Sequence, residues 1–88
     1  MKVLVLYRPQ SEHARRTEEF VENIKRQHGV KLDVVDVDSR DGVATASMYD
    51  IMLYPAVLVM TLDGRLIKLW SGEEVPPMPN EVVAYTFS

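Results

Sequence analysis

An uninterrupted apolar run near the N-terminus constrains the fold of this chain more than any other feature. Residues 3–7 read VLVLY, and such a run is typical of a strand that is buried on both faces of a sheet. Pro9 ends the predicted strand, because proline cannot donate a hydrogen bond to a ladder. Ser11 is a favourable N-cap for the charged helical pattern behind it. The sequence therefore predicts a strand over 2–7 that leads through a short turn into a helix.

The segment 12–28 has the pattern of an amphipathic helix. Its apolar or small positions recur at helical spacing on one face, and charged residues cover the opposite side. Gly29 has the position expected of the residue that ends a helix in the left-handed conformation. The predicted inward face consists of Thr17, Phe20, Val21, Ile24 and His28.

A second strand is predicted over 31–37. So short a strand–helix–strand unit requires parallel pairing of its two strands through a right-handed crossover. A second helix is expected over 41–49, capped by Ser39 or Asp41, although Gly42 in its first turn lowers its intrinsic stability. The residues expected on its inward face are Ala44, Met48 and Ile51.

The C-terminal half is predicted to add a hairpin and a last short helix. Strands are expected over 56–60 and 65–70, and Asp63–Gly64 between them is a signal for a two-residue hairpin turn. Closely spaced prolines predict an extended, non-helical linker over 73–80. A helix should follow over 81–87. The residues expected to lie on the sheet are Val82, Val83 and Phe87.

Composition narrows the class of protein. With 88 residues, 47% hydrophobic and 26% charged, the chain has the makeup of one small globular domain over 1–88. The net charge of −3 disfavours nucleic acid or an anionic membrane as a partner, because both favour basic faces. No apolar run approaches the roughly 18 residues needed to span a bilayer, and the apolar part of the N-terminus is too short for a signal peptide. A cytoplasmic location is the default expectation.

The predicted order β-α-β-α-β-β-α, with Tyr54–Pro55 directly before the third strand, resembles the thioredoxin/glutaredoxin superfamily over essentially the whole chain. Residues 7–16, YRPQSEHARR, resemble the exit of the family's first strand and its Cys-x-x-Cys helix start, with Ser11 and Ala14 in place of the two cysteines. Residues 49–55, YDIMLYP, resemble the segment that ends in the cis-proline facing that motif. The resemblance implies an α/β thioredoxin-like domain, with a four-stranded mixed sheet of order 2-1-3-4 and three flanking helices.

The departure from the family's motif excludes the family's redox chemistry. The chain has no cysteine, so it can form no disulfide, zinc–thiolate site or thiol redox couple. Ser11 offers a hydroxyl whose pKa lies far above that of a thiol, and Ala14 has no side-chain heteroatom. We therefore expect no dithiol oxidoreductase activity, no catalytic residue of that type and no cofactor.

The resemblance implies that a peptide-binding surface is retained. In the family, the residue before the cis-proline offers its backbone N–H and C=O to an extended peptide, and Tyr54 would do so here. Pro55 alone would favour a trans bond, whereas the resemblance favours cis. Met52 and Leu53 lie in a loop and are expected to join Tyr54 in an exposed patch. The predicted function is a non-catalytic binding or adaptor domain for a peptide or protein partner.

Basic side chains gather near the predicted start of the first helix, namely Arg8, His13, Arg15 and Arg16. They could hold an anion, such as phosphate or a partner's carboxylate, on the unpaired amides of the first turn. The preferred alternative is that Ser11 caps its own helix while the arginines are solvated. The candidate binding residues are Ser11, His13, Ala14, Arg15, Met52, Leu53, Tyr54 and Pro55.

A second function stays open beside the adaptor. A small-thiol-binding domain or a non-thiol enzyme could use Tyr7 or Ser11 to orient a ligand such as glutathione. The acidic pair Glu73 and Glu74 counts against it, because these side chains would repel the ligand carboxylate. A homodimer is also compatible with the sequence, since a short last helix leaves sheet surface uncovered.

Three aspartates at the end of the second predicted strand and shortly after it could suggest a metal site, namely Asp36, Asp38 and Asp41. The glycine and glutamate of an EF-hand loop do not accompany them, and acidic loops after strands are common. We therefore expect a solvated loop that caps the next helix, and no bound metal.

Overall fold

The computed structural model describes residues 1–86. The elements follow in the order β1 (Lys2–Tyr7), α1 (Ala14–His28), β2 (Asp33–Asp36), α2 (Arg40–Met48), β3 (Ala56–Met60), β4 (Leu66–Ser71), a 3₁₀ helix η1 (Gly72–Glu74) and α3 (Pro79–Thr86). The strands form one mixed sheet in the order β2-β1-β3-β4. β1 pairs with β2 in parallel, and β3 is antiparallel to both β1 and β4. The predicted fold class and strand order are confirmed.

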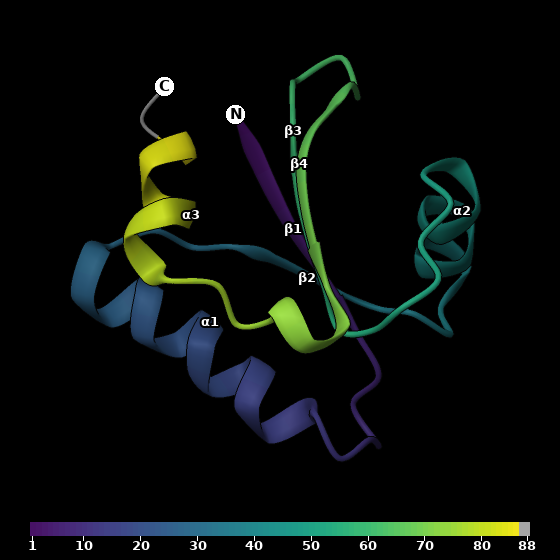
Figure 1. Ribbon diagram of the computed structural model, residues 1–88, viewed down its shortest axis with the longest axis horizontal. Helices are drawn as coiled ribbons and strands as arrows, with labels where there is room; N and C mark the ends of the chain where they lie inside the picture. Colours follow the sequence, from purple (N-terminus) through teal and green to yellow (C-terminus); the bar gives the residue numbers. More distant parts are fainter. Residues whose placement is uncertain (87–88) are drawn as a thin grey trace.

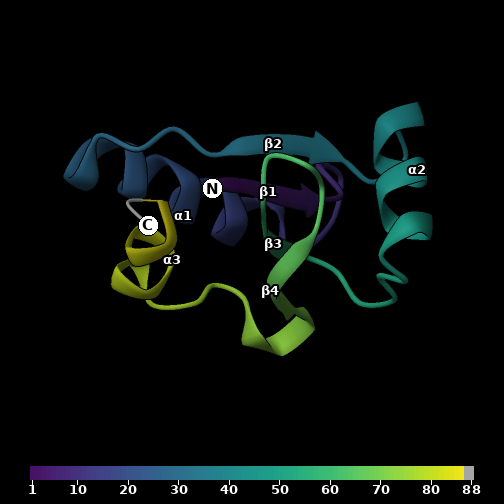
Figure 2. The ribbon, with the colours of Figure 1, turned by 90° about the horizontal axis from the view of Figure 1, so that it is seen from above.

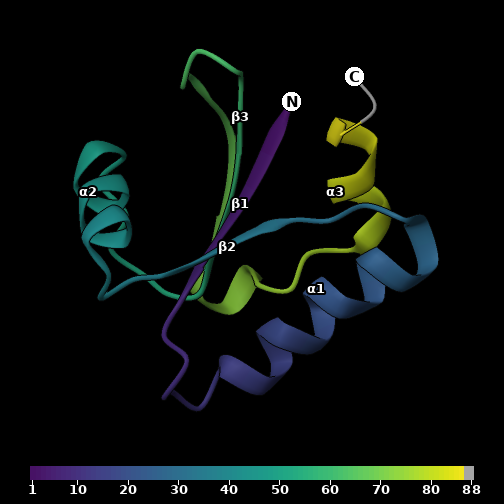
Figure 3. The ribbon, with the colours of Figure 1, turned by 180° about the vertical axis from the view of Figure 1, so that it is seen from behind.

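Helices cover both faces of this sheet. α1 and α3 lie on one face and α2 lies on the other, as Figures 1 and 3 show from opposite sides. Alternation along β1 sends Val3 and Val5 into the core under α1 and α3, and Leu4 and Leu6 into the core under α2. Both faces of β1 are therefore buried, which explains the continuous apolar run at 3–7.

α1 packs as the spacing of its apolar residues predicts. Its buried residues are Ala14, Thr17, Phe20 and Ile24. Val21 is half-buried and packs against the same core. Gly29 ends the helix with φ of 67°, in the predicted left-handed conformation.

α2 packs differently from the prediction. Ala44 is exposed and the Met48 side chain is 73% exposed, so the expected inward face is wrong for both. A Cβ on Gly42 would lie only 2.0 Å from the Asp36 carbonyl oxygen, so the helix backbone rests directly on the end of β2. Gly42 is accordingly the one buried residue of α2. The half-buried residues that pack on the sheet from this side are Ala46 and Tyr49.

The C-terminal segment is more helical than the prediction. η1 occupies Gly72–Glu74 and α3 begins at Pro79, so the fully extended linker expected over 73–80 is wrong at both ends. Proline suits the first position of a helix, because an N–H there would have no partner within the helix. Val82 and Val83 are buried as expected, and Phe87 lies outside the described residues.

Candidate functional site

Arg8, in the turn between β1 and α1, connects the loops that meet at one end of the sheet. Its guanidinium donates to both carboxylate oxygens of Asp38, from Nε at 3.0 Å and from Nη2 at 3.3 Å. Its Cζ atom lies 6.0 Å from the centroid of the Tyr54 ring. Asp38 follows β2 and Tyr54 precedes β3, so one side chain joins three loops. The hydrogen bond from Arg8 also lowers the pKa of the Asp38 carboxyl from its ordinary value.

Ser11 and His13 hold the backbone of the same arginine. The Ser11 hydroxyl donates to the Arg8 carbonyl oxygen, as does the Ser11 N–H at 3.1 Å. Nε2 of His13 accepts a hydrogen bond from the Arg8 N–H at 3.1 Å, which requires that nitrogen to be unprotonated. Burial, followed by the charges of Arg16 and Arg8, lowers the pKa of His13 and favours this form. We call Arg8, Ser11, His13, Asp38 and Tyr54 the Arg8 junction.

Ser11 does not cap α1, so the predicted capping role is wrong. The N-cap residue is His13, whose side chain makes no capping hydrogen bond, and the helix begins at Ala14. Ala14 is buried, and its N–H donates to the Ser11 carbonyl oxygen at 3.3 Å. A serine hydroxyl can bond backward to a carbonyl as readily as forward to an amide, and here the turn at Arg8 takes it backward.

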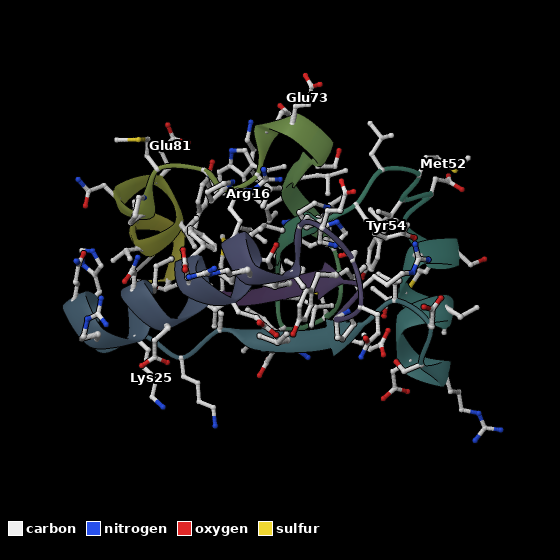
Figure 4. All side chains as sticks on the ribbon, turned by 90° about the horizontal axis from the view of Figure 1, so that it is seen from below. Arg16, Lys25, Met52, Tyr54, Glu73 and Glu81 are labelled. Carbon is white, nitrogen blue, oxygen red and sulfur yellow. The ribbon has the colours of Figure 1, made fainter. Side chains whose placement is uncertain are left out.

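Arg15 lies apart from the Arg8 junction. Its side chain is 91% exposed and pairs with Glu19 one turn along α1, with an Nε–Oε1 distance of 3.2 Å. Arg16 lies beside the proline segment, where it lines a hollow with Pro76 and Pro77 (Figure 4). The basic residues of the predicted anion site therefore point to separate neighbours.

The loop before β3 presents two apolar side chains to solvent, as expected. Met52 is 83% exposed and Leu53 is 62% exposed. Tyr54 is half-buried against the core under α2, and its hydroxyl donates to the Ile51 carbonyl oxygen at 3.3 Å. Pro55 is buried, and the Tyr54–Pro55 bond is cis, the isomer that the resemblance implies. Figure 4 shows Met52 on the outside of the loop, with Tyr54 turned inward.

The turn after β4 supports this loop from its other side. The Gly72 N–H donates to the Pro55 carbonyl oxygen at 2.9 Å. A Cβ on Gly72 would lie 3.4 Å from the Leu53 side chain, and Gly72 has φ of 60°, a conformation that favours glycine. Met52–Pro55, which we call the Pro55 loop, is therefore held between the Arg8 junction and Gly72.

The Tyr7 side chain does not join the Arg8 junction and bonds to α1 instead. It is 8% exposed, and its hydroxyl donates to Oε2 of Glu18 on α1 at 2.6 Å. That hydrogen bond, followed by burial, raises the pKa of Tyr7 to about 12. The phenol therefore stays protonated at neutral pH and is committed to Glu18.

Asp36, the last residue of β2, and Asp38 make hydrogen bonds within their own loop or to the neighbouring turn. Oδ1 of Asp36 accepts from the Asp38 N–H at 2.9 Å, and the Ser39 hydroxyl accepts from the Gly42 N–H at 3.0 Å to cap α2. Within residues 1–86, no three His, Asp or Glu side chains are gathered so that they could hold a metal ion. No helix in the same part of the chain is long and apolar enough to cross a membrane.

Comparison with solved structures identifies the architecture. Thioredoxin 1 from the thermophilic eubacterium Thermosipho africanus superposes with a TM-score of 0.70 at 14% sequence identity, over 99% of this chain and 96% of that chain. The oxidised thioredoxin from Plasmodium falciparum also gives a TM-score of 0.70, at 17% identity, over 94% of this chain and 78% of that chain. This chain has the thioredoxin fold. No protein-family model and no curated protein sequence matches it.

Within the thioredoxin fold, the site combines predicted and unforeseen residues. Ser11, His13 and Tyr54 meet at the Arg8 junction, whereas Arg15 does not. Sequence reasoning missed the pairing of Arg8 with Asp38 and the role of Gly72. The first had a usable signal, because both residues directly follow neighbouring parallel strands and must come out at the same end of the sheet.

Proposed function

We propose that this thioredoxin-like chain is a redox-inactive binding domain that holds an extended segment of a partner protein at the Pro55 loop. The observation that carries the proposal is the exposure of Met52 and Leu53 directly beside the buried Pro55. Removing apolar surface from water contributes roughly 25 cal/mol per Å² to binding. Two large apolar side chains on a supported loop therefore favour a partner that covers them.

The backbone of the loop supports the same mode of binding. Among residues 1–86, neither the N–H nor the C=O of Tyr54 has a hydrogen-bond partner. An extended peptide could pair with both groups by strand addition, while its side chains contact Met52 and Leu53. The Arg8 junction and Gly72 already fix the loop, so little conformational entropy would be lost on binding.

The residues at the positions of the family's cysteines suit a holding role. The full sequence has no cysteine, the Ser11 hydroxyl is committed to the Arg8 carbonyl oxygen, and Ala14 is buried. The small-thiol or enzymatic alternative is favoured by no contact in the site, because the Tyr7 hydroxyl also has an internal acceptor. Glutathione is therefore expected to cause no saturable NMR shifts at Ser11 or Tyr54, and saturable shifts there would favour that alternative.

The proposal can be tested by affinity capture with matched baits from cells that express the protein. The test bait carries Met52→Ser and Leu53→Ser. The control bait carries Leu62→Ser, which makes the same kind of change at a side chain that is 92% exposed in the turn between β3 and β4. Proteins captured by the wild-type and control baits should be lost, or reduced about tenfold, with the test bait.

All three baits should first give the same thermal unfolding curve, because each altered side chain is exposed. Capture that is equal for the test and control baits would show that the Pro55 loop is not the binding surface. Capture lost with the Leu62→Ser bait alone would move the surface to the opposite end of β3.

A further inference from the structure

β2 forms one edge of the sheet, and Figure 2 shows it as the outermost strand. Among residues 1–86, the outward-facing backbone groups of Val34 have no partner, whereas the Asp36 carbonyl oxygen accepts hydrogen bonds from the N–H and the hydroxyl of Ser39. The Val37 N–H donates to the Tyr7 carbonyl oxygen at 3.0 Å, so the backbone groups of Val37, and of Val35 two positions earlier, face β1. Backbone polar groups alternate along a strand, so those of Val34 face outward. A second extended chain could therefore pair with β2 at this edge.

A hollow of about 160 Å³ opens beside this edge, between β2 and α1. The parallel register pairs Val5 with Val34 and Tyr7 with Asp36, which turns Val34 and Asp36 toward α1. Val34, which is 43% exposed, and Val21 on α1 give the hollow apolar walls. The space is thus suited to an aliphatic stem that enters from the edge.

The rim of the hollow is acidic. Glu18 and Glu22 line it from successive turns of α1, and Asp36 lies at the adjoining end of β2. Oε2 of Glu18 accepts a hydrogen bond from the Tyr7 hydroxyl. In the part of the chain from 1 to 86, none of the three carboxylates belongs to an ion pair. Their negative charge is left to attract a basic group.

Among residues 1–86, no basic side chain forms an ion pair with this rim. Arg8 pairs with Asp38 at 3.0 Å, and Lys2 pairs with Asp33 at 4.0 Å on the other face of β2. Lys25 lies further along α1 and does not line the hollow (Figure 4).

We infer that this edge binds a basic extended segment of a partner protein by strand addition to β2, with a lysine or arginine side chain in the hollow. The stem of that side chain would lie on Val21 and Val34, and its charged head would reach Glu18 and Glu22. The next residue on the same face, two positions along the segment, would lie beside Asp36. The recognised pattern is therefore two basic residues separated by one residue. This surface is separate from the Pro55 loop, and the inference does not rest on the proposed function.

A second copy of this chain is a poorer occupant. Two antiparallel β2 strands would bring the carboxylates of Asp33 and Asp36 toward those of the other copy, and like charges across a strand pair are destabilising. The full sequence also has no two Lys or Arg residues separated by one residue. The charge pattern accordingly favours a different, basic partner.

The test uses the full ¹⁵N-labelled chain and a capped hexapeptide, Thr-Lys-Val-Lys-Val-Thr. Saturable amide shifts are expected in 33–36 and at Val21, with 52–54 unchanged. A peptide with Glu in place of both Lys should not bind, because the rim is acidic. A lysine peptide that is N-methylated at alternate residues should also fail, because it keeps the charge but cannot pair with the edge.

Two double variants separate the effect of the rim carboxylates from the effect of the net charge of the chain. Glu18→Gln with Glu22→Gln should weaken binding by about tenfold or more, as expected for the loss of charge-assisted hydrogen bonds. The matched control, Glu73→Gln with Glu81→Gln, removes the same charge at exposed positions away from the hollow (Figure 4) and should bind like the wild type. Val34→Pro should abolish binding, because it removes an outward-facing N–H while the bonds to β1 remain.

Several results would overturn the inference. These are an absence of saturable shifts at about millimolar peptide, equal binding of the N-methylated peptide, or equal weakening by the two double variants. Shifts confined to 52–54 would assign the peptide to the Pro55 loop instead. Shifts in 33–36 that depend on protein concentration alone would identify a second copy as the occupant.

Discussion

α1 and α2 cover opposite faces of one sheet, yet different interactions hold them in place. The buried residues of α1 are Ala14, Thr17, Phe20 and Ile24, whereas the only buried residue of α2 is Gly42. α1 is fixed by burial of side chains. α2 is fixed by a close backbone contact with Asp36, by the Ser39 cap and by half-buried side chains such as Ala46.

Much of the exposed apolar surface lies in or directly after the lightly buried helix. Among residues 1–86, four of the six large apolar residues that are more than half exposed lie in α2 or in the loop after it, namely Val43, Met48, Met52 and Leu53, and the other two are Leu62 and Met78. The Pro55 loop therefore follows an element with few buried side chains, while α1 and the sheet form the stable scaffold. A binding surface built in this way can change its side chains at little expense in folding free energy.

The largest effect should come from truncating the α1 core. Ile24 is fully buried, so Ile24→Ala is expected to reduce the free energy of unfolding by about 3 kcal/mol, through lost burial and a residual cavity. The matched change in α2 is Met48→Ala. It should alter the free energy of unfolding by less than about 0.5 kcal/mol, because Met48 is 73% exposed. Urea unfolding measures both values. Similar losses for the two variants would break the comparison.

The next effect should come from the backbone contact of α2. Gly42→Ala places a methyl group where it would lie 2.0 Å from the Asp36 carbonyl oxygen, so α2 must move. We expect the free energy of unfolding to fall by about 2 kcal/mol, in the range for overpacking, and the NMR signals of 49–55 to shift. Gly29→Ala is the control. Its Cβ meets nothing within 4 Å, so its effect of about 1 kcal/mol comes from the left-handed φ and should leave 49–55 unchanged.

A smaller effect is expected at the Arg8 junction, where His13 should make the free energy of unfolding depend on pH. Burial, followed by Arg16 and Arg8, lowers the pKa of His13 below 6.5 in the folded chain. The unfolded chain therefore binds the proton at higher pH, so this contribution to stability is complete above about pH 6.5 and is lost as the pH falls toward the folded pKa.

Unfolding midpoints between about pH 5 and about pH 7.5 measure this contribution, because that window lies where histidine titrates. His13→Gln should flatten the dependence, whereas His28→Gln, which removes the chain's other histidine, should retain it. Equal profiles for the two variants would show that protonation of His13 is not coupled to folding.

The sequence contained most of the fold because local patterns and global packing agree. The apolar run at 3–7 and the face of α1 each specify one element, and the shortness of the strand–helix–strand unit specifies parallel pairing. Asp63–Gly64 correctly marks the hairpin between β3 and β4, but a two-residue turn there is wrong, because the Gly64 N–H donates to the Thr61 carbonyl oxygen and centres the turn on Leu62 and Asp63. The orientation of α2 could not be obtained from periodicity. The contact between Gly42 and Asp36 rotates that helix, and a glycine contributes nothing to an apolar pattern.

The candidate site was predictable only in part. The exposure of Met52 and Leu53 follows from apolar residues in a loop. The direction of the Ser11 hydroxyl does not, because a short polar side chain has backbone partners on both sides. The pairing of Arg8 with Asp38, 30 residues apart in sequence, depends on the sheet order. Such contacts become visible only when the strands have been placed.

Photocrosslinking inside cells that express the protein tests most directly whether the Pro55 loop is a surface for holding a partner. A photoreactive benzoylphenylalanine is introduced at position 52 in one variant and at position 62 in another, since Met52 and Leu62 are both strongly exposed. A discrete crosslinked partner is expected at position 52 and should be missing at position 62. Crosslinks of equal yield at both positions, or none at position 52, would contradict this role of the Pro55 loop.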